Sequence, residues 1–325
     1  MHIPDGFLDA KTAIATGVLS FAGLGFALRE ARRTLPPGKI PLLGLSAAFV
    51  FAAQMLNFPV AGGTSGHMVG GVLVAALLGP SAGVIVLSSV LIVQCFMFAD
   101  GGITALGANI LNMGIMGAVV GWMIYALLSR FIPGLFGRIV AAVVAAWIST
   151  VLAAILCAGE LAASGTVPWG IAFPAMAGIH MLIGIGEGVI TALVLASIGA
   201  TRPELLLRPA SAEVPSARPY RSILVFGFIA AMGLALFVSP FACPWPDGLD
   251  KAAETLGFKD KEAEQRAIPA PVTDYKMPGI GSDAVATSIA GAVGTVVVFG
   301  GAWLLARSLV PKAKTANVES EPPST

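Results

Sequence analysis

The first two residues of the chain, Met1 and His2, can chelate a metal ion before any folding is considered. The α-amine of Met1, the deprotonated backbone nitrogen of His2 and Nδ1 of the His2 ring can close two fused chelate rings around one ion. Three nitrogens then lie in one plane, which suits Ni(II) or Cu(II) rather than tetrahedral zinc or an oxygen-bound ion. One more nitrogen would complete a square. The chain has only three histidines, and His67 is the candidate for that position.

Several features predict that this terminus is held in place, although most chain termini fray. Pro4, Asp5 and Gly6 form a turn signal, and an apolar stretch begins directly after them. The positively charged region of a signal peptide is missing, so we expect no cleavage that would remove the chelator. The α-amine titrates at about pH 8, and it can therefore lose its proton to a metal at neutral pH.

The composition predicts an all-α, polytopic membrane protein, because 56% of the residues are hydrophobic and only 11% are charged. The net charge of +1 and the lack of basic runs with interleaved aromatics argue against a nucleic-acid partner. The chain has no phosphate-binding loop of the Gly-x-x-x-x-Gly-Lys-Ser/Thr type and no Gly-x-Ser-x-Gly nucleophile elbow. We therefore expect no enzymatic activity, and any ATP hydrolysis must come from a separate subunit.

Nine apolar stretches approach the length of about 20 residues that a membrane-spanning helix needs. They cover residues 9–28, 40–57, 67–79, 81–98, 105–128, 139–158, 172–198, 220–240 and 284–306. The third and fourth abut at Gly79 and Pro80, which predicts a tight helical hairpin with His67 at its outer end. Arginines and lysines concentrate in four segments that all fall on one side if the N-terminus is outside.

These stretches predict two membrane blocks. Residues 1–200 form a seven-helix metal-binding domain, and the proline-rich residues 201–218 form a cytoplasmic linker. Residues 219–307 form a two-helix domain whose outer loop covers residues 240–282. The polar residues 308–325 are expected to be a disordered cytoplasmic tail.

Polar side chains inside the apolar stretches are functional candidates, since their burial in a membrane is costly. Gln54 and Asn57 lie three residues apart and share a helix face, as do Asn109 and Asn112. Each pair either links helices or forms a second shell that orients the histidines. Asp100 could attract a cation or cap the fifth helix, and capping is the preferred interpretation.

His180 and Glu187 define an alternative centre. They lie seven residues apart, on one helix face and about 10 Å apart along its axis. One alternative function is a membrane-embedded metalloenzyme built around these two residues, although the sequence offers no open coordination position or substrate pocket. Another is a proton-coupled metal transporter in which Glu187 carries the proton. A third reading is purely structural, with both side chains satisfied by neighbouring helices.

A set of motifs over residues 1–200 resembles the CbiM/NikM family, the substrate-capture (S) components of energy-coupling-factor nickel and cobalt transporters. Residues 219–307 are similar to the accessory component of nickel systems, which carries a Pro-Asp-Gly-Leu-Glu motif; here the last residue is aspartate. The matching segments are Met1-His2-Ile3-Pro4-Asp5-Gly6-Phe7, Gln54-Met55-Leu56-Asn57-Phe58-Pro59, Thr64-Ser65-Gly66-His67, Phe98-Ala99-Asp100-Gly101-Gly102-Ile103-Thr104, Asn109 with Asn112, Gly184-Ile185-Gly186-Glu187-Gly188 and Pro246-Asp247-Gly248-Leu249-Asp250.

This resemblance implies that Met1, His2 and His67 hold Ni(II) or Co(II) in a square of nitrogens. The ion is then the transported substrate, and no organic cofactor is expected. The implied partners are a transmembrane scaffold (T) component, a cytoplasmic ATPase and membrane lipid. The implied location is the bacterial cytoplasmic membrane, and the fused accessory component favours nickel over cobalt.

Overall fold

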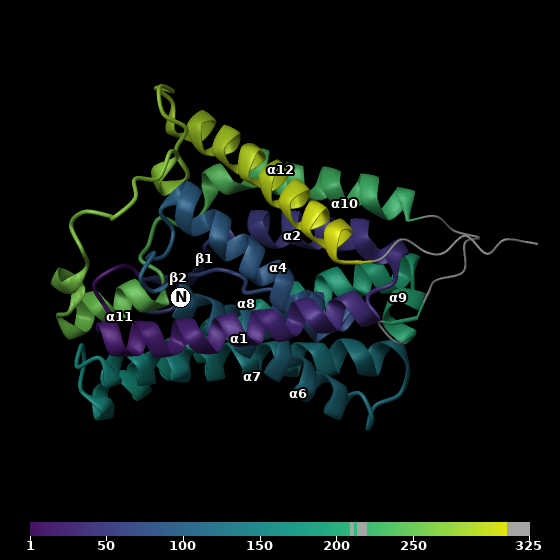
Figure 1. Ribbon diagram of the computed structural model, residues 1–325, viewed down its shortest axis with the longest axis horizontal. Helices are drawn as coiled ribbons and strands as arrows, with labels where there is room; N and C mark the ends of the chain where they lie inside the picture. The colour runs from purple at the N-terminus through teal and green to yellow at the C-terminus, as the bar shows by residue number, and fades with distance from the viewer. Residues whose placement is uncertain (209–210, 213–219, 311–325) are drawn as a thin grey trace, which may run out of the picture.

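The computed structural model describes residues 1–208, 211–212 and 220–310. In these ranges the chain is helical apart from one two-stranded hairpin (Figure 1). The long helices are α1 (Ala10–Thr34), α2 (Ile40–Gln54), α4 (Pro80–Val93), α7 (Gly134–Ala163), α8 (Trp169–Thr201), α10 (Arg221–Gly233) and α12 (Asp283–Leu309). The short ones are α3 (Gly71–Leu78), α5 (Leu106–Asn109), α6 (Gly121–Leu128), α9 (Glu204–Leu207) and α11 (Gly248–Leu256).

Wider, π-type turns extend three of these helices. They are η2 (Gln94–Phe98) after α4, η3 (Ile110–Val120) between α5 and α6, and η4 (Leu234–Val238) after α10. Single 3₁₀ turns are η1 (Pro37–Lys39), η5 (Ser239–Phe241), η6 (Lys259–Lys261) and η7 (Thr273–Tyr275). The antiparallel strands β1 (Phe58–Val60) and β2 (Thr64–Gly66) pair with Pro59 opposite Ser65.

Seven helices of the described residues are long and apolar enough to cross a membrane, rather than the nine predicted. The seven are Ala10–Thr34, Pro80–Phe98, Leu106–Leu128, Gly134–Ala163, Trp169–Thr201, Arg221–Phe241 and Asp283–Leu309. The predicted stretch 40–57 ends as a helix at Gln54, because β1 starts four residues later. The stretch 67–79 contains only the eight-residue α3, because the chain enters it extended and Gly70 has a φ of +83°.

The hairpin predicted at Gly79 and Pro80 is present. Gly79 adopts a φ of +89°, a conformation that glycine accepts without steric cost, and it ends α3. Pro80 then begins α4, where the missing backbone N–H costs no helical hydrogen bond. The two helices pack against each other.

The two ends of the helical body carry different segments (Figure 1). The N-terminus, β2 and α11 lie toward one end, while α9 and the C-terminal end of α12 lie at the other. This is the segregation that the positive charges predicted; which end faces outside stays a prediction. Residues 209–210 and 213–218 of the predicted linker and residues 311–325 of the predicted tail lie outside the described residues. The described parts of these two segments include helix at residues 204–207 and 308–309, in α9 and at the end of α12.

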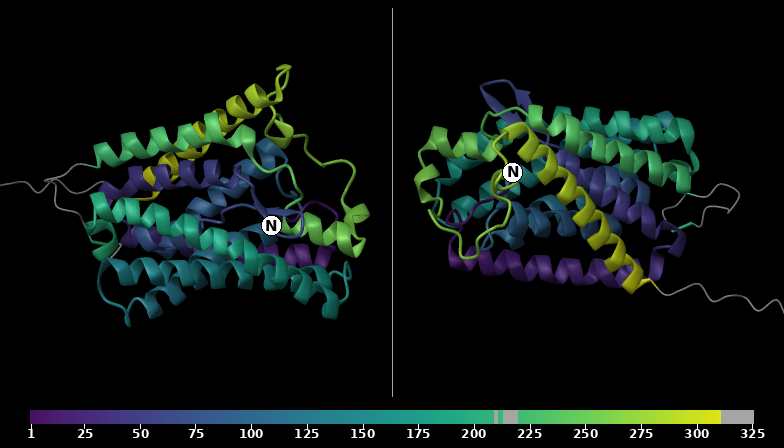
Figure 2. Two further views of the ribbon diagram at one scale, coloured as in Figure 1. Left: turned by 180° about the vertical axis from the view of Figure 1, so that it is seen from behind. Right: turned by 90° about the horizontal axis from the view of Figure 1, so that it is seen from above.

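The C-terminal helices pack on the N-terminal ones. Both α10 and α12 contact α2, and α12 also reaches α4, which is largely enclosed (Figure 2). The chain between η5 and α12 crosses the end of the body that holds the N-terminus. Through α11, this outer loop contacts β2 and α8.

Candidate metal centre

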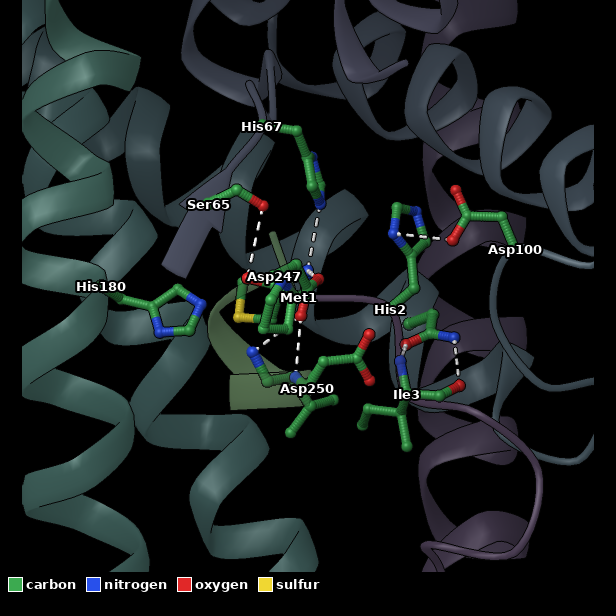
Figure 3. Close-up of polar contacts among 12 residues, drawn as sticks. Met1, His2, Ile3, Ser65, His67, Asp100, His180, Asp247 and Asp250 are labelled. Atoms are coloured by element: carbon green, nitrogen blue, oxygen red, sulfur yellow. Dashed lines mark hydrogen bonds and ion pairs between the residues drawn. The ribbon is translucent and has the colours of Figure 1, made fainter. Parts of the chain in front are cut away.

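The amino terminus is buried at the centre of a polar cluster (Figure 3). The nitrogen of the Met1 amine lies 3.0 Å from Nε2 of His67 and 2.6 Å from Oδ2 of Asp247. Met1 as a whole is only 4% exposed. Of the two histidines that could supply a fourth nitrogen, His67 and His180, the one chosen from the sequence is therefore in hydrogen-bond contact with the terminal amine.

Backbone contacts of Ile3 hold the terminus in this position. Its N–H donates to Oδ1 of Asn109 at 2.8 Å, and its carbonyl accepts from Nδ2 of Asn109 at 3.1 Å and from the backbone N–H of Gly102 at 2.8 Å. Two residues later, Oδ1 of Asp5 accepts from the N–H and the hydroxyl of Thr104. The expectation that the terminus folds back agrees with this arrangement, and Asn109 hydrogen-bonds to the backbone of the terminal segment.

The ring of His2 stacks on the ring of His67, with centroids 5.0 Å apart. Its Nδ1 lies 3.2 Å from Oδ1 of Asp100, and its Nε2 lies 3.2 Å from Oε1 of Gln94. Burial lowers the pKa of His2, while the negative charge of Asp100 opposes that shift. Gln94 was not singled out from the sequence; it lies at the start of a π-type turn, a feature that often accompanies functional sites.

His67 follows β2 directly and is presented with one ring nitrogen turned toward the amine. Its Nδ1 is 3.0 Å from the carbonyl of Met68, so Nδ1 carries the proton and Nε2 keeps its lone pair when the ring is neutral. Burial, the Met1 ammonium and His2 together hold the pKa of His67 well below its usual range. The ring is therefore neutral at physiological pH, which is the state that binds metals.

Asp247 is the residue of the cluster that the sequence reasoning missed. Its Oδ1 caps α11 by accepting from the backbone N–H groups of Leu249 and Asp250, and its Oδ2 accepts from the Met1 amine. Burial alone would raise its pKa, but the Met1 ammonium and His67 hold the pKa of Asp247 below its usual range. Its motif had been recognised, but nothing in the sequence linked that motif to a terminus 246 residues away.

Asp100 does not cap the fifth helix, contrary to the preferred interpretation. The residue that precedes α5 is Ala105, and no side chain caps it. Asp100 instead lies between His2 and Tyr275, whose hydroxyl donates to its Oδ2 at 2.6 Å. The helix starts six residues after Asp100, too far for an N-cap, because the intervening residues form an irregular loop.

The other residues that the sequence suggested as candidates for orienting the histidines have different surroundings. Nε2 of Gln54 donates to the carbonyl of Val69, two residues after His67. Asn57 does not share a helix face with Gln54, because α2 has already ended. Nδ2 of Asn112 donates to Oε2 of Glu160 on α7, which is a link between helices.

His180 and Glu187 lie on one face of α8 and are both buried, as predicted. The two oxygens of Glu187 accept from the backbone N–H groups of Val69 and Gly70, at 2.6 and 2.9 Å. Nδ1 of His180 contacts the carbonyl of Met176 at 2.8 Å. His180 also lines a cavity of about 10 Å³ together with Met1, His67 and Asp247, which is room for about one water-sized species.

No group of three His, Cys, Asp or Glu side chains within the described ranges is arranged to hold a metal ion. Nitrogens outside that set of side chains, such as the terminal amine and backbone amides, can also bind metal ions. The cluster of Met1, His2 and His67 offers both, and we call it the terminal cluster. Asp247 and Asp100 flank it with negative charge.

Comparison with known proteins agrees with the two-part organisation. Residues 2–205 match the family model CbiM, described as the cobalt uptake substrate-specific transmembrane region. Residues 221–310 match the model of the PDGLE domain.

Similar proteins include fused and single-domain relatives. A putative fused nickel transport protein NikMN of Archaeoglobus fulgidus is 40% identical over 94% of this chain and 98% of its own length. The fused nickel transport protein NikMN of Rhodobacter capsulatus is 37% identical, with 71% of this chain and 70% of its own length covered. The crystal structure of a truncated transition metal transporter is 34% identical over 61% of this chain and 98% of its own, with a TM-score of 0.55.

Together the two family models cover nearly the whole chain, and the CbiM model alone covers well over half of it. The relative from Archaeoglobus fulgidus also matches nearly the whole chain. The protein is thus a multi-pass membrane transport component and not an enzyme, and it belongs to the CbiM family of nickel and cobalt transport proteins, here fused to a PDGLE domain.

Proposed function

We propose that this protein captures Ni(II) or Co(II) as the S component of an ATP-driven energy-coupling-factor importer. The ion is bound by four nitrogens in a square: the Met1 amine, the backbone nitrogen and Nδ1 of His2, and Nε2 of His67. The observation that carries this proposal is the distance of 3.0 Å between the Met1 amine and Nε2 of His67.

That distance suits neighbouring corners of a square of ligands. Metal–nitrogen bonds in proteins are about 2.0 Å long, so two nitrogens at right angles around one ion lie about 2.8–3.0 Å apart. The other two nitrogens follow from the covalent structure of residues 1 and 2, because chelate rings fix their spacing. Binding of the ion would remove one proton from the Met1 ammonium and one from the backbone nitrogen of His2, and both protons would pass to solvent. The observed hydrogen bond would then be replaced by coordinate bonds from the amine and from Nε2 of His67.

The proposed site requires one change at His2. In the structure its Nδ1 faces the carboxylate of Asp100, so Nδ1 must exchange that carboxylate for the metal, and Gln94 is the acceptor available to Nε2. A ligand histidine commonly donates its other ring N–H to such an acceptor, which fixes the ring orientation. The carboxylates of Asp100 and Asp247 also favour the approach of a cation.

The names of the fused relatives support nickel as the substrate of this protein, and the sequence supports an energy source in a separate subunit. The fused relatives are named nickel transport proteins, whereas relatives such as that of Methanococcus voltae, which lines up with 63% of this chain, are named cobalt transport proteins. The chain has no nucleotide-binding loop, so a transmembrane T component and a cytoplasmic ATPase supply the driving force. Because the relatives come from archaea and bacteria, the bacterial cytoplasmic membrane stays a prediction.

The alternative centre at His180 and Glu187 is less well supported. Each carboxylate oxygen of Glu187 accepts from one backbone N–H group, so the residue anchors the segment after His67. These hydrogen bonds account for the buried carboxylate without a metal ion or a transported proton. No observation favours a catalytic metal at this position.

The test is to add one glycine before Met1 and to measure Ni(II) binding by competition with a chromophoric chelator. The extra residue moves the amine by about 3.8 Å along the chain and places an amide where the amine belongs. We expect binding to be lost. The control is His180→Ala with the natural terminus, which should bind normally; undiminished affinity in the extended protein would refute the terminal chelator.

A further inference from the structure

Asp247 connects the PDGLE domain to the terminal cluster, and nothing in the family match explains the contact. We propose that Asp247 is a positioning residue that fixes the Met1 amine as a metal ligand, so that the PDGLE domain completes the metal site of the CbiM region. This inference rests on the proposed function. It assigns a physical role to the Pro246-Asp247-Gly248-Leu249 sequence.

The carboxylate of Asp247 performs two tasks at once. Its Oδ1 accepts from the first N–H groups of α11, Leu249 at 2.8 Å and Asp250 at 2.9 Å. This cap sets the direction of the second oxygen, and Oδ2 lies 2.6 Å from the Met1 nitrogen. The side chain of Met1 is 2% exposed and that of Asp247 17%, so this ion pair is largely shielded from solvent.

The segment that carries Asp247 is itself fixed against the CbiM region. The backbone N–H of Ser65 donates to the carbonyl of Pro246 at 2.8 Å, and the Ser65 hydroxyl donates to the carbonyl of Trp245 at 2.7 Å. A side chain at Gly248 would come within 2.8 Å of Cε1 of His180. The proline carbonyl, the aspartate and the glycine of the motif thus each have a partner within the metal-binding region.

The contact between Oδ2 of Asp247 and the Met1 amine can persist once the ion is bound. In the structure the amine contacts His67 and Asp247. When Nε2 of His67 turns its lone pair to a metal, the coordinated amine still carries N–H bonds that need an acceptor, and Oδ2 of Asp247 is placed to accept one. Outer contacts of this kind orient metal ligands, and their loss typically weakens metal binding about 10–100-fold.

The experiment compares Asp247→Ser with Asp250→Asn in the full-length protein. Serine caps a helix about as well as aspartate but is too short to reach the amine. Asp250 lies in the same helix, where it pairs with the half-exposed Lys259. Asp247→Asn is a second variant, because its single oxygen cannot both cap α11 and accept from the amine.

Two quantities are measured: the Ni(II) dissociation constant, and the rate at which an amine-acylating reagent modifies Met1 in the metal-free protein. We expect both Asp247 variants to bind nickel about 10–100-fold more weakly and to be acylated faster than wild type. Asp250→Asn should match wild type in both. Ser65→Ala, which loosens the same segment but leaves the amine contact, should keep the amine protected.

The outcomes separate this inference from the proposed function. If His67→Ala loses nickel while both Asp247 variants bind it as wild type does, the positioning role is wrong and the terminal site stands. If His67→Ala binds nickel normally, the terminal site itself is wrong. Faster acylation in Ser65→Ala equal to that in Asp247→Ser would also overturn the inference, because loosening of the loop alone would then explain the result.

Discussion

The terminal cluster and the pair on α8, His180 and Glu187, are both buried polar groups in the same part of the molecule, yet they differ in where their lone pairs point. In the α8 pair, backbone groups take both oxygens of Glu187 and Nδ1 of His180. In the terminal cluster, Nε2 of His67 points at another potential ligand. Burial of polar groups is therefore common to both regions, and what distinguishes the terminal cluster is the contact between His67 and the terminal amine.

The two regions are also coupled through a short piece of backbone. Glu187 accepts hydrogen bonds from the N–H groups of Val69 and Gly70, and Gln54 donates one to the carbonyl of Val69. These residues follow His67 within three positions, so their anchoring fixes where the imidazole emerges. Glu187 thus contributes to the position of His67 in the terminal cluster.

The largest expected effect separates the two histidines. His67→Ala removes one of four proposed ligands and should weaken Ni(II) binding by more than the about 100-fold that marks the upper range for second-shell changes. His180→Ala removes only a lining residue of the small cavity and should leave the affinity little changed. Isothermal titration with the purified protein measures both. Weak binding in His180→Ala with normal binding in His67→Ala would move the site to α8.

A smaller effect is expected from Glu187→Gln, which tests whether the α8 pair is structural. The amide has one acceptor oxygen and would turn a donor toward one of two backbone N–H groups, leaving it unsatisfied. Such a loss costs about 1–3 kcal/mol of folding free energy. We expect a lower thermal unfolding temperature for the metal-free protein and a modest loss of affinity. An unaltered unfolding temperature with complete loss of transport would instead favour proton transfer by Glu187.

The smallest effect is a pH dependence of the metal-free protein. Burial lowers the pKa values of His2 and His67 in the folded state below the ordinary histidine value of 6.5. As the pH falls below that value, the unfolded chain binds protons that the folded chain does not, so the free energy of unfolding decreases. The unfolding temperature should therefore fall between about pH 7 and pH 5, and less steeply in His67→Ala. Equal slopes in the two proteins would contradict the neutral, buried state of His67.

Local patterns predicted the class of the protein and the two histidines of the candidate site. Composition and apolar runs indicated a multi-pass helical protein, and the residues after Met1 and His2 indicated a held terminus. The prediction of a membrane-spanning stretch over residues 67–79 was wrong, because the residues between β2 and α3 are not helical and α3 has only eight residues. Hydropathy alone does not distinguish such a stretch from a membrane-spanning helix.

Contacts between distant segments could not be predicted. Asp100 looked like a cap because it precedes a helix in the sequence, but its partners are His2 and Tyr275, 98 and 175 residues away along the chain. Asp247 lies in a recognised motif, and the role of that motif depends on the packing of α11 against β2 and α8. Side chains that act across such distances become apparent only once the fold brings their elements together.

The most direct test of the central claim is the absorption spectrum and magnetic state of the purified full-length protein loaded with Ni(II). Square-planar coordination by four nitrogens predicts one equivalent of diamagnetic, yellow Ni(II), lost in His2→Ala and in His67→Ala. Octahedral or tetrahedral paramagnetic nickel that is indifferent to both substitutions would contradict the account, and it would show that the amino terminus does not bind the transported ion.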